Sequence, residues 1–218
     1  VKKYHRTFSS IVNTLIEVGF SINKMIEPLP TEEILSQYPD YKDLFHIALK
    51  LISSPAAAWE EIRLEEDKQK VFMAFVYPLI GLCGLSVFIG TIFSLGWSGP
   101  QSFQIAMTKC CAIAVSLFGG YYLASYLLNE LSMRMLKRED NLLLMQQFAG
   151  YAMVVLFVLQ IIIGLMPEFS IVAILLQFYI AIVVWEGSDK LLLIAENERV
   201  RFTIIATIIL IACPSIIQ

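Results

Sequence analysis

The side chains most able to do chemistry in this sequence are few and lie far apart. The two histidines, His5 and His46, fall in different parts of the chain, and the four cysteines all lie within apolar runs. Such cysteines act as small hydrophobic residues, and the adjacent Cys110 and Cys111 face two sides of a helix with no histidine nearby. We find no nucleophile–base pair, no metal-ligand spacing and no phosphate loop. The sequence therefore predicts no enzyme, no cofactor and no metal.

Two glutamines inside long apolar stretches are the next candidates. Gln147 and Gln160 carry both donors and acceptors, so each is able to join two helices within a membrane for about 0.5–2 kcal/mol. Lining a transport path is the alternative interpretation. Ion-coupled carriers use buried carboxylates or cations, and we expect the cores of the apolar stretches to hold no ionisable side chain. We therefore favour a packing role for both glutamines.

The elements that position these side chains are predicted to be membrane helices. The chain has 218 residues, of which 57% are hydrophobic and 16% charged, whereas soluble domains are about 45–50% apolar and about 25% charged. The net charge of −3 gives no basic surface for nucleic acid. We predict an all-α, polytopic bundle of about five transmembrane helices in the lipid bilayer, with a short α/β N-terminal tail. The expected spans are 71–97, 103–128, 143–166, 169–185 and 202–218.

The loops between these spans predict the orientation. Lys and Arg lie before the first span, between the second and third, and between the fourth and fifth, but are missing from the turns at 98–101 and Pro167. All basic loops then fall on one side, which is the cytoplasmic side in most membrane proteins. We expect a cytoplasmic N-terminus and a C-terminus on the far side.

A segment ahead of the first span has a different pattern. Residues 44–62 carry an apolar stripe at helical spacing, broken where Ser54 is able to cap a new helix that starts at Pro55. This helix pair either lies on the cytoplasmic membrane surface or packs on the bundle, and the pattern favours neither. Trp59 is the residue we expect to anchor it, to lipid or to a partner, because indole joins apolar area to one polar N–H.

Small residues indicate close helix packing in the first two spans. Gly81 and Gly84 follow Pro78, which we expect to kink the first span. Gly120 and Ala124 form a small-x-x-x-small pair that lets two helix backbones approach. A packed bundle follows, and the same residues allow a homodimer.

Residues from about 41 to the end resemble the Yip family of membrane proteins, in its bacterial branch. The resemblance rests on ISSPAAAWEEI at 52–62, Pro78, the five-span layout and VWEGSDKLLLIAENERVRF at 184–202. For eukaryotic members it implies contact with prenylated small GTPases and a role in vesicle traffic. A bacterial member would lie in the inner membrane without those partners.

Residues 4–43 are similar to something else, the C-terminal tail of a class I SAM-dependent methyltransferase. Tyr4-His5-Arg6, a helix ending at Gly19, a strand over 20–26 and Glu27-Pro28-x-Pro30 carry this resemblance. The Gly-rich SAM-binding half of that fold is missing, so the tail is not expected to methylate anything. We expect a fragmentary or artefactual join, and a chain truncated at both ends.

The predicted organisation is a methyltransferase-like tail at 1–43, interfacial helices at 44–70 and a five-span Yip-like domain at 71–218. We expect a non-enzymatic membrane scaffold or adaptor with a protein partner on its cytoplasmic face. Its working surface would combine 55–62, 65–70 and 186–201. The alternatives are a small permease or transporter accessory subunit, and a membrane-tethered methyltransferase if the gene extends upstream.

Overall fold

The computed structural model describes residues 39–64, 72–96 and 99–217, and these form helices without any strand. The described helices belong to a compact unit that starts at Asp40. Five of its helical segments are long and apolar enough to cross a membrane, so the predicted all-α polytopic bundle is confirmed. These segments are Phe72–Leu95, Pro100–Leu136, Leu142–Leu165, Pro167–Lys190 and Glu196–Ile217.

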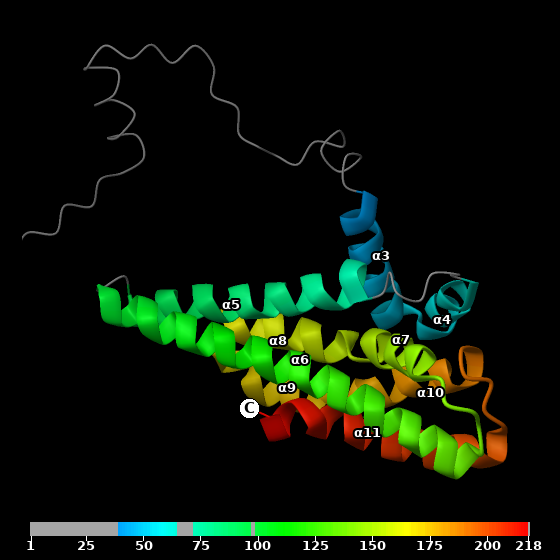
Figure 1. Ribbon diagram of the computed structural model, residues 1–218. Helices are drawn as coiled ribbons and strands as arrows, with labels where there is room; N and C mark the ends of the chain where they lie inside the picture. Colours follow the sequence, from blue (N-terminus) through cyan, green and yellow to red (C-terminus); the bar gives the residue numbers. More distant parts are fainter. Residues whose placement is uncertain (1–38, 65–71, 97–98, 218) are drawn as a thin grey trace, which may run out of the picture. The chain divides into compact units, whose positions relative to one another are not determined.

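Two helices precede the spans, and several spans consist of more than one helical piece (Figure 1). In chain order the elements are α3 (Pro39–Ser53), α4 (Pro55–Leu64), the π-helical turn η1 (Phe72–Val76), α5 (Tyr77–Leu95), α6 (Pro100–Leu136), α7 (Leu142–Ala152), α8 (Val154–Leu165), η2 (Pro167–Phe169), α9 (Ser170–Leu176), η3 (Gln177–Tyr179), α10 (Ile180–Lys190) and α11 (Glu196–Ile217). The methyltransferase-like tail predicted at 1–43 lies almost wholly outside the described residues, as does the charged run 65–70.

The bundle has two distinct ends. We call α3 and α4 the cap. The end of the bundle that carries α4 and the loops 137–141 and 191–195 is the cap end, and the end with Gly96, Gly99 and the turn at 166–169 is the turn end (Figure 1). At the turn end, Gly96 and Gly99 have φ values of +71° and +121°, which only glycine adopts readily. Both glycines lie between the end of α5 at Leu95 and the start of α6 at Pro100.

Helix bounds differ from the expected ones in three spans, and the fifth begins at Glu196 in place of residue 202. Helix α6 has 37 residues and continues past Leu128 to Leu136, where Lys137 ends it in the left-handed conformation. The fourth span is not short, because α9, η3 and α10 follow one another without a break as far as Lys190. The extensions of the second and fourth spans carry charged or polar residues at the cap end. A prediction based on apolar residues alone therefore ends the spans too early.

Pro78 lies at the start of α5 and not in its middle. The π-helical turn η1 immediately precedes α5, so the irregular backbone falls one turn before the proline. Because η1 and α5 form the continuous segment Phe72–Leu95, Pro78 cannot donate a backbone hydrogen bond to the turn before it. The irregular backbone of the first span thus lies in the turn that precedes Pro78, where a kink due to proline is expected.

Helices α3 and α4 pack on the bundle. Leu44, Ala48 and Leu51 of α3 are buried, and the Tyr179 hydroxyl donates a hydrogen bond of 2.6 Å to the Ile52 carbonyl. Helix α4 lies against α10. The described residues of this segment therefore pack on the bundle.

Candidate functional site

Trp59 is the centre of the contact between α4 and the membrane helices. Its side chain is 0% exposed, and its indole N–H donates to the Val183 carbonyl at 2.9 Å. The ring stacks on Phe148 with centroids 5.5 Å apart. A Cβ on Gly187 would stand 2.6 Å from the indole, so only glycine leaves room for it. Trp59 thus anchors the cap to protein; its ring faces neither lipid nor solvent.

A cluster of aromatic rings surrounds Trp59 and fills the cap half of the bundle. Tyr151 stands edge-on to Trp59 at 6.1 Å and lies 4.7 Å from Phe75, while Phe148 contacts Phe202 at 6.0 Å. These rings come from α4, η1, α7 and α11. Aromatic pairs at such distances add stability beyond the area they bury. The cap is therefore held by the same core that joins the spans.

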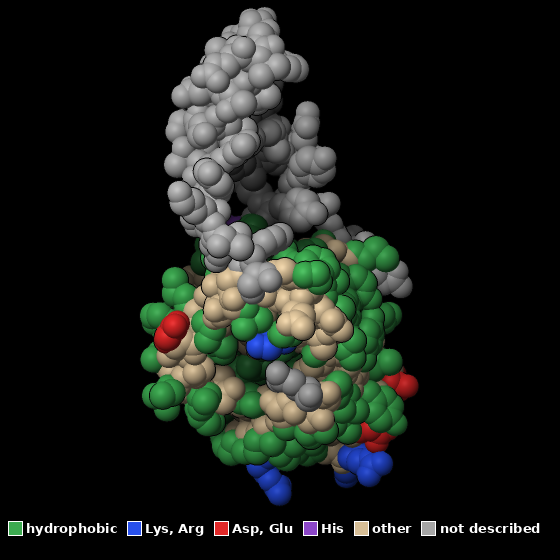
Figure 2. Space-filling model, turned by 90° about the vertical axis from the view of Figure 1, so that its left-hand side faces the viewer, with side chains coloured by type: hydrophobic (Ala, Val, Ile, Leu, Met, Phe, Trp, Pro, Cys, Tyr) green, Lys and Arg blue, Asp and Glu red, His purple; other side chains and the backbone are tan. Residues whose placement is uncertain are grey.

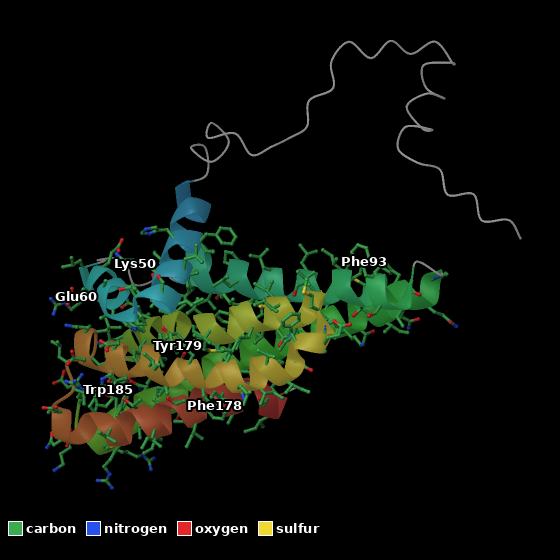
Figure 3. The ribbon with its side chains drawn as sticks, turned by 180° about the vertical axis from the view of Figure 1, so that it is seen from behind. Lys50, Glu60, Phe93, Phe178, Tyr179 and Trp185 are labelled. Atoms are coloured by element: carbon green, nitrogen blue, oxygen red, sulfur yellow. The ribbon has the colours of Figure 1, made fainter. Side chains whose placement is uncertain are left out.

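Ion pairs fasten the cap on its outer side. Glu60 of α4 pairs with Lys190 at 3.0 Å, and a second pair joins Lys50 of α3 to Glu61. The labelled side chains Lys50 and Glu60 lie together at the cap end in Figure 3. Because these groups are partly exposed, each pair contributes little to stability. Their effect is to fix the direction of α3 and α4.

The loops of the cap end are tied to one another as well. Arg138 donates to the Leu193 carbonyl at 3.2 Å, which links the loop after α6 to the loop after α10. Arg199 pairs with Asp189 and lies 5.3 Å from the centre of the Trp185 ring. Segments from four parts of the chain therefore form one fixed surface.

The expected packing residues fall into different environments. Ala124 is 0% exposed, and a Cβ on Gly120 would meet Pro214 of α11 at 2.6 Å. Gly84 faces Cys110 of α6, whose sulfur would stand 3.1 Å away. Gly81 has nothing within 4 Å of its Cβ position and is exposed. Within the described unit, three of these positions pack helices and Gly81 does not.

The tightest helix crossing was not identified from the sequence. A Cβ on Gly90 would lie 1.8 Å from the Gly164 carbonyl oxygen, and one on Gly164 would lie 2.4 Å from the Ser86 hydroxyl. Helices α5 and α8 thus touch backbone to backbone. Gly164 lies three residues before Pro167, so the sequence pattern favours a turn there and does not indicate a helix contact.

The two glutamines occupy opposite halves of the bundle. Gln147 is 1% exposed in the cap half, and neither its amide nitrogen nor its oxygen has a hydrogen-bond partner. Gln160 lines a hollow in the turn half, together with Lys109 of α6. Lys109 is an ionisable side chain within the expected second span, 103–128, near the end of that span at the turn end. It is visible in the sequence and has no acidic neighbour in its helix turn.

The arrangement of these residues supplies packing and a fixed surface. Among the described residues, no group of three or more His, Cys, Asp or Glu is placed to hold a metal ion. Together, the five apolar helices, the buried aromatic core and the exposed apolar side chains along the spans define a multi-pass integral membrane protein in contact with lipid.

Its family follows from a comparison with known proteins. The model of the Yip1 domain matches residues 49–217, most of the chain, so the chain belongs to the Yip1 domain family. The expected Yip resemblance is thereby confirmed. No curated protein and no solved structure matches the chain.

Proposed function

We propose that the protein is a non-enzymatic membrane scaffold or adaptor of the Yip type, which binds a protein partner through its cap end. The observation that carries this proposal is the rigid attachment of the cap, from the buried Trp59 to the Glu60–Lys190 ion pair. A binding surface held by the core loses little conformational entropy when a partner docks.

The outer face of α3 is the part of the cap best suited to a protein partner. Phe45 and Leu49 are 54% and 66% exposed, one helical turn apart, with the exposed His46 beside them. Apolar side chains rimmed by polar ones are typical of protein interaction sites. This face extends the working surface expected at 55–62 and 186–201.

Photo-crosslinking in cells tests the proposal. We expect a crosslinking amino acid at Leu49 to give one discrete protein adduct, which is lost when Phe45 is replaced by Ser. The matched control is Phe93, which is 81% exposed on α5 at the turn end and faces outward in Figure 3. Equal adducts at both positions, or none at Leu49, contradict a docking surface on α3.

The proposed orientation places the cap end in the cytoplasm, in the inner membrane of a bacterium. Its support is the concentration of basic side chains at that end, among them Arg134, Lys137 and Arg201, which matches the usual bias of cytoplasmic loops. In a cysteine-free background, we expect an impermeant maleimide to label a cysteine at Glu168 in intact cells. A cysteine at Lys137 should react only after the cells are opened; the reverse pattern inverts the orientation.

A small permease or transporter accessory subunit is the second candidate function. Two adjoining hollows in the turn half favour it, because both are lined by Gln160. The test is uptake of solute by reconstituted vesicles. Uptake that is lost in Gln160→Leu but kept when Phe45 is replaced by Ser would support transport over scaffolding. A homodimer through the exposed Gly81 face of α5 is compatible with either function.

The methyltransferase-like tail at 1–43 bears on a third function. We propose that this tail is dispensable for the bundle, since the cap is anchored by residues from Leu44 onward. Deleting residues 1–38 should leave membrane insertion and thermal unfolding unchanged. A large loss of either would make the tail an integral part of this protein, as a membrane-tethered methyltransferase requires.

A further inference from the structure

The spacing of the charged residues along α6 indicates how deep Lys109 lies in the membrane. The twenty residues 110–129 that separate it from Glu130 carry no charge. At 1.5 Å per helical residue they span roughly 30 Å, the thickness of the hydrocarbon core. If Glu130 marks one boundary of this core, Lys109 marks the other, on the turn side, at the level of the lipid phosphates.

The exposed side chain of Lys109 lines a hollow at the turn end. The hollow has a volume of about 380 Å³, within the range of small-molecule pockets, and it lies between the ends of α5, α6 and α8. Thr91, Ser94 and Gln160 supply the polar part of its wall, and Val87 and Ile163 part of the apolar remainder. Figure 2 looks onto this end and shows a hollow with basic side-chain atoms in it.

The hollow carries an uncompensated positive charge. Lys109 has no ion pair among the described residues, although Glu168 lies at the same end of the bundle. No acidic residue occurs anywhere from Phe72 to Asn129. A cation near hydrocarbon is unfavourable without a partner. The site is therefore electrostatically complementary to an anion.

The wall behind the cation is apolar over most of its length. A second hollow shares Ile113, Gln160 and Ile163 with the first and continues toward α9 and α11, where Ala173 and Ile211 line it beside the polar Gln177 and Ser215. A free inorganic anion would gain nothing from the apolar part of this wall. An anionic head attached to a hydrocarbon chain would use both parts.

We propose that the Lys109 hollow binds the anionic, phosphate-bearing headgroup of a membrane lipid from the leaflet at the turn end. The Lys109 ammonium presents three N–H donors to the phosphate oxygens. Thr91 and Ser94 add hydroxyl donors, and the Gln160 amide adds another at the entrance to the apolar hollow. The lipid chain then follows the apolar wall. This site is independent of the cap and of any partner there.

Native mass spectrometry of the full chain in detergent tests the proposal with defined lipids. We expect phosphatidylglycerol to bind more tightly than phosphatidylcholine, and diacylglycerol, which lacks the phosphate, to bind weakest. Lys109→Gln should weaken phosphatidylglycerol binding at least about tenfold, since a charge-assisted hydrogen bond is lost. Lys109→Arg should retain binding. Lys137→Gln is the matched control, because it removes one exposed basic side chain at the cap end.

Several results would overturn the site. Equal weakening by Lys109→Gln and Lys137→Gln would mean general attraction of anionic lipid, with Lys109 merely reaching toward water. Displacement of the lipid by millimolar inorganic phosphate would identify a free-anion site instead. If Lys109→Gln does not fold, the order of the three lipids on the unaltered chain decides, together with Gln160→Leu. Equal binding of all three lipids refutes the proposal.

Discussion

The cap half and the turn half of this bundle use the same helices in opposite ways. In the cap half, large rings fill the space between helices, and Trp59, Phe148 and Tyr151 leave the core closed. In the turn half, α5 and α8 meet through bare backbone at Gly90 and Gly164, and hollows adjoin the crossing. Large side chains that fill the space between helices give a rigid cap half. Helices that touch through their backbones leave space beside the contact, where a ligand fits. The proposed docking surface and the proposed lipid site thus lie in halves of the domain that are packed in different ways.

Replacing Trp59 tests the closed half and should have the largest effect. We expect Trp59→Ala to destabilise the protein by about 3–5 kcal/mol, because it empties the core and leaves the Val183 carbonyl without its 2.9 Å donor. The unfolding temperature in detergent measures this. Trp185→Ala is the control, since Trp185 is only partly buried. Equal losses in the two variants would show that Trp59 is no special anchor.

Adding one methyl group at the crossing tests the open half. Gly90→Ala should destabilise by about 1–3 kcal/mol through overpacking, because the new Cβ would stand 1.8 Å from a backbone oxygen that cannot rotate away. Gly81→Ala in the same helix meets nothing within 4 Å. It should be neutral or slightly stabilising, since alanine favours helix over glycine by about 1 kcal/mol. Similar unfolding temperatures for both variants would refute the close contact.

The smallest expected effect is a slight increase in stability when Gln147 is replaced by Leu. Gln147→Leu removes a buried amide that has no hydrogen-bond partner, and an unsatisfied polar group of this kind costs about 1–3 kcal/mol. Part of that gain is lost to the different shape of leucine, so we expect a slightly raised unfolding temperature. A lowered one would mean that Gln147 has a partner, such as a bound water, within the cap half.

Much of the fold is readable from the sequence, because apolar length and basic loops report the spans directly. The five helices and the helix break before Pro55 are both found, although α6 runs on to Leu136. The direction in which a side chain points is harder to predict from the sequence. The helical pattern around Trp59 is typical of an interfacial residue, whereas Gly187, which makes room for the Trp59 ring, lies 128 positions later in the chain. Only the packed structure brings the two together.

The membrane site shows a different kind of limit. Lys109 is plain in the sequence, and its distance from Glu130 is a usable signal of depth. The residues around Lys109 cannot be predicted in the same way, since Thr91 and Gln160 come from other spans and are ordinary polar residues in isolation. The Gly90–Gly164 crossing is likewise a property of two helices, and neither glycine reveals it alone.

The anchoring of Trp59 has a consequence for how the protein is made. Its hydrogen-bond acceptor, Val183, lies 124 residues further along the chain. At about 5–20 residues per second, synthesis needs roughly 6–25 seconds to reach that residue after Trp59. During this interval the cap helix has left the ribosome while its seat does not yet exist. The apolar face of α4 is then open to chaperones and to lipid, and the cap closes only when the fourth span is in the membrane.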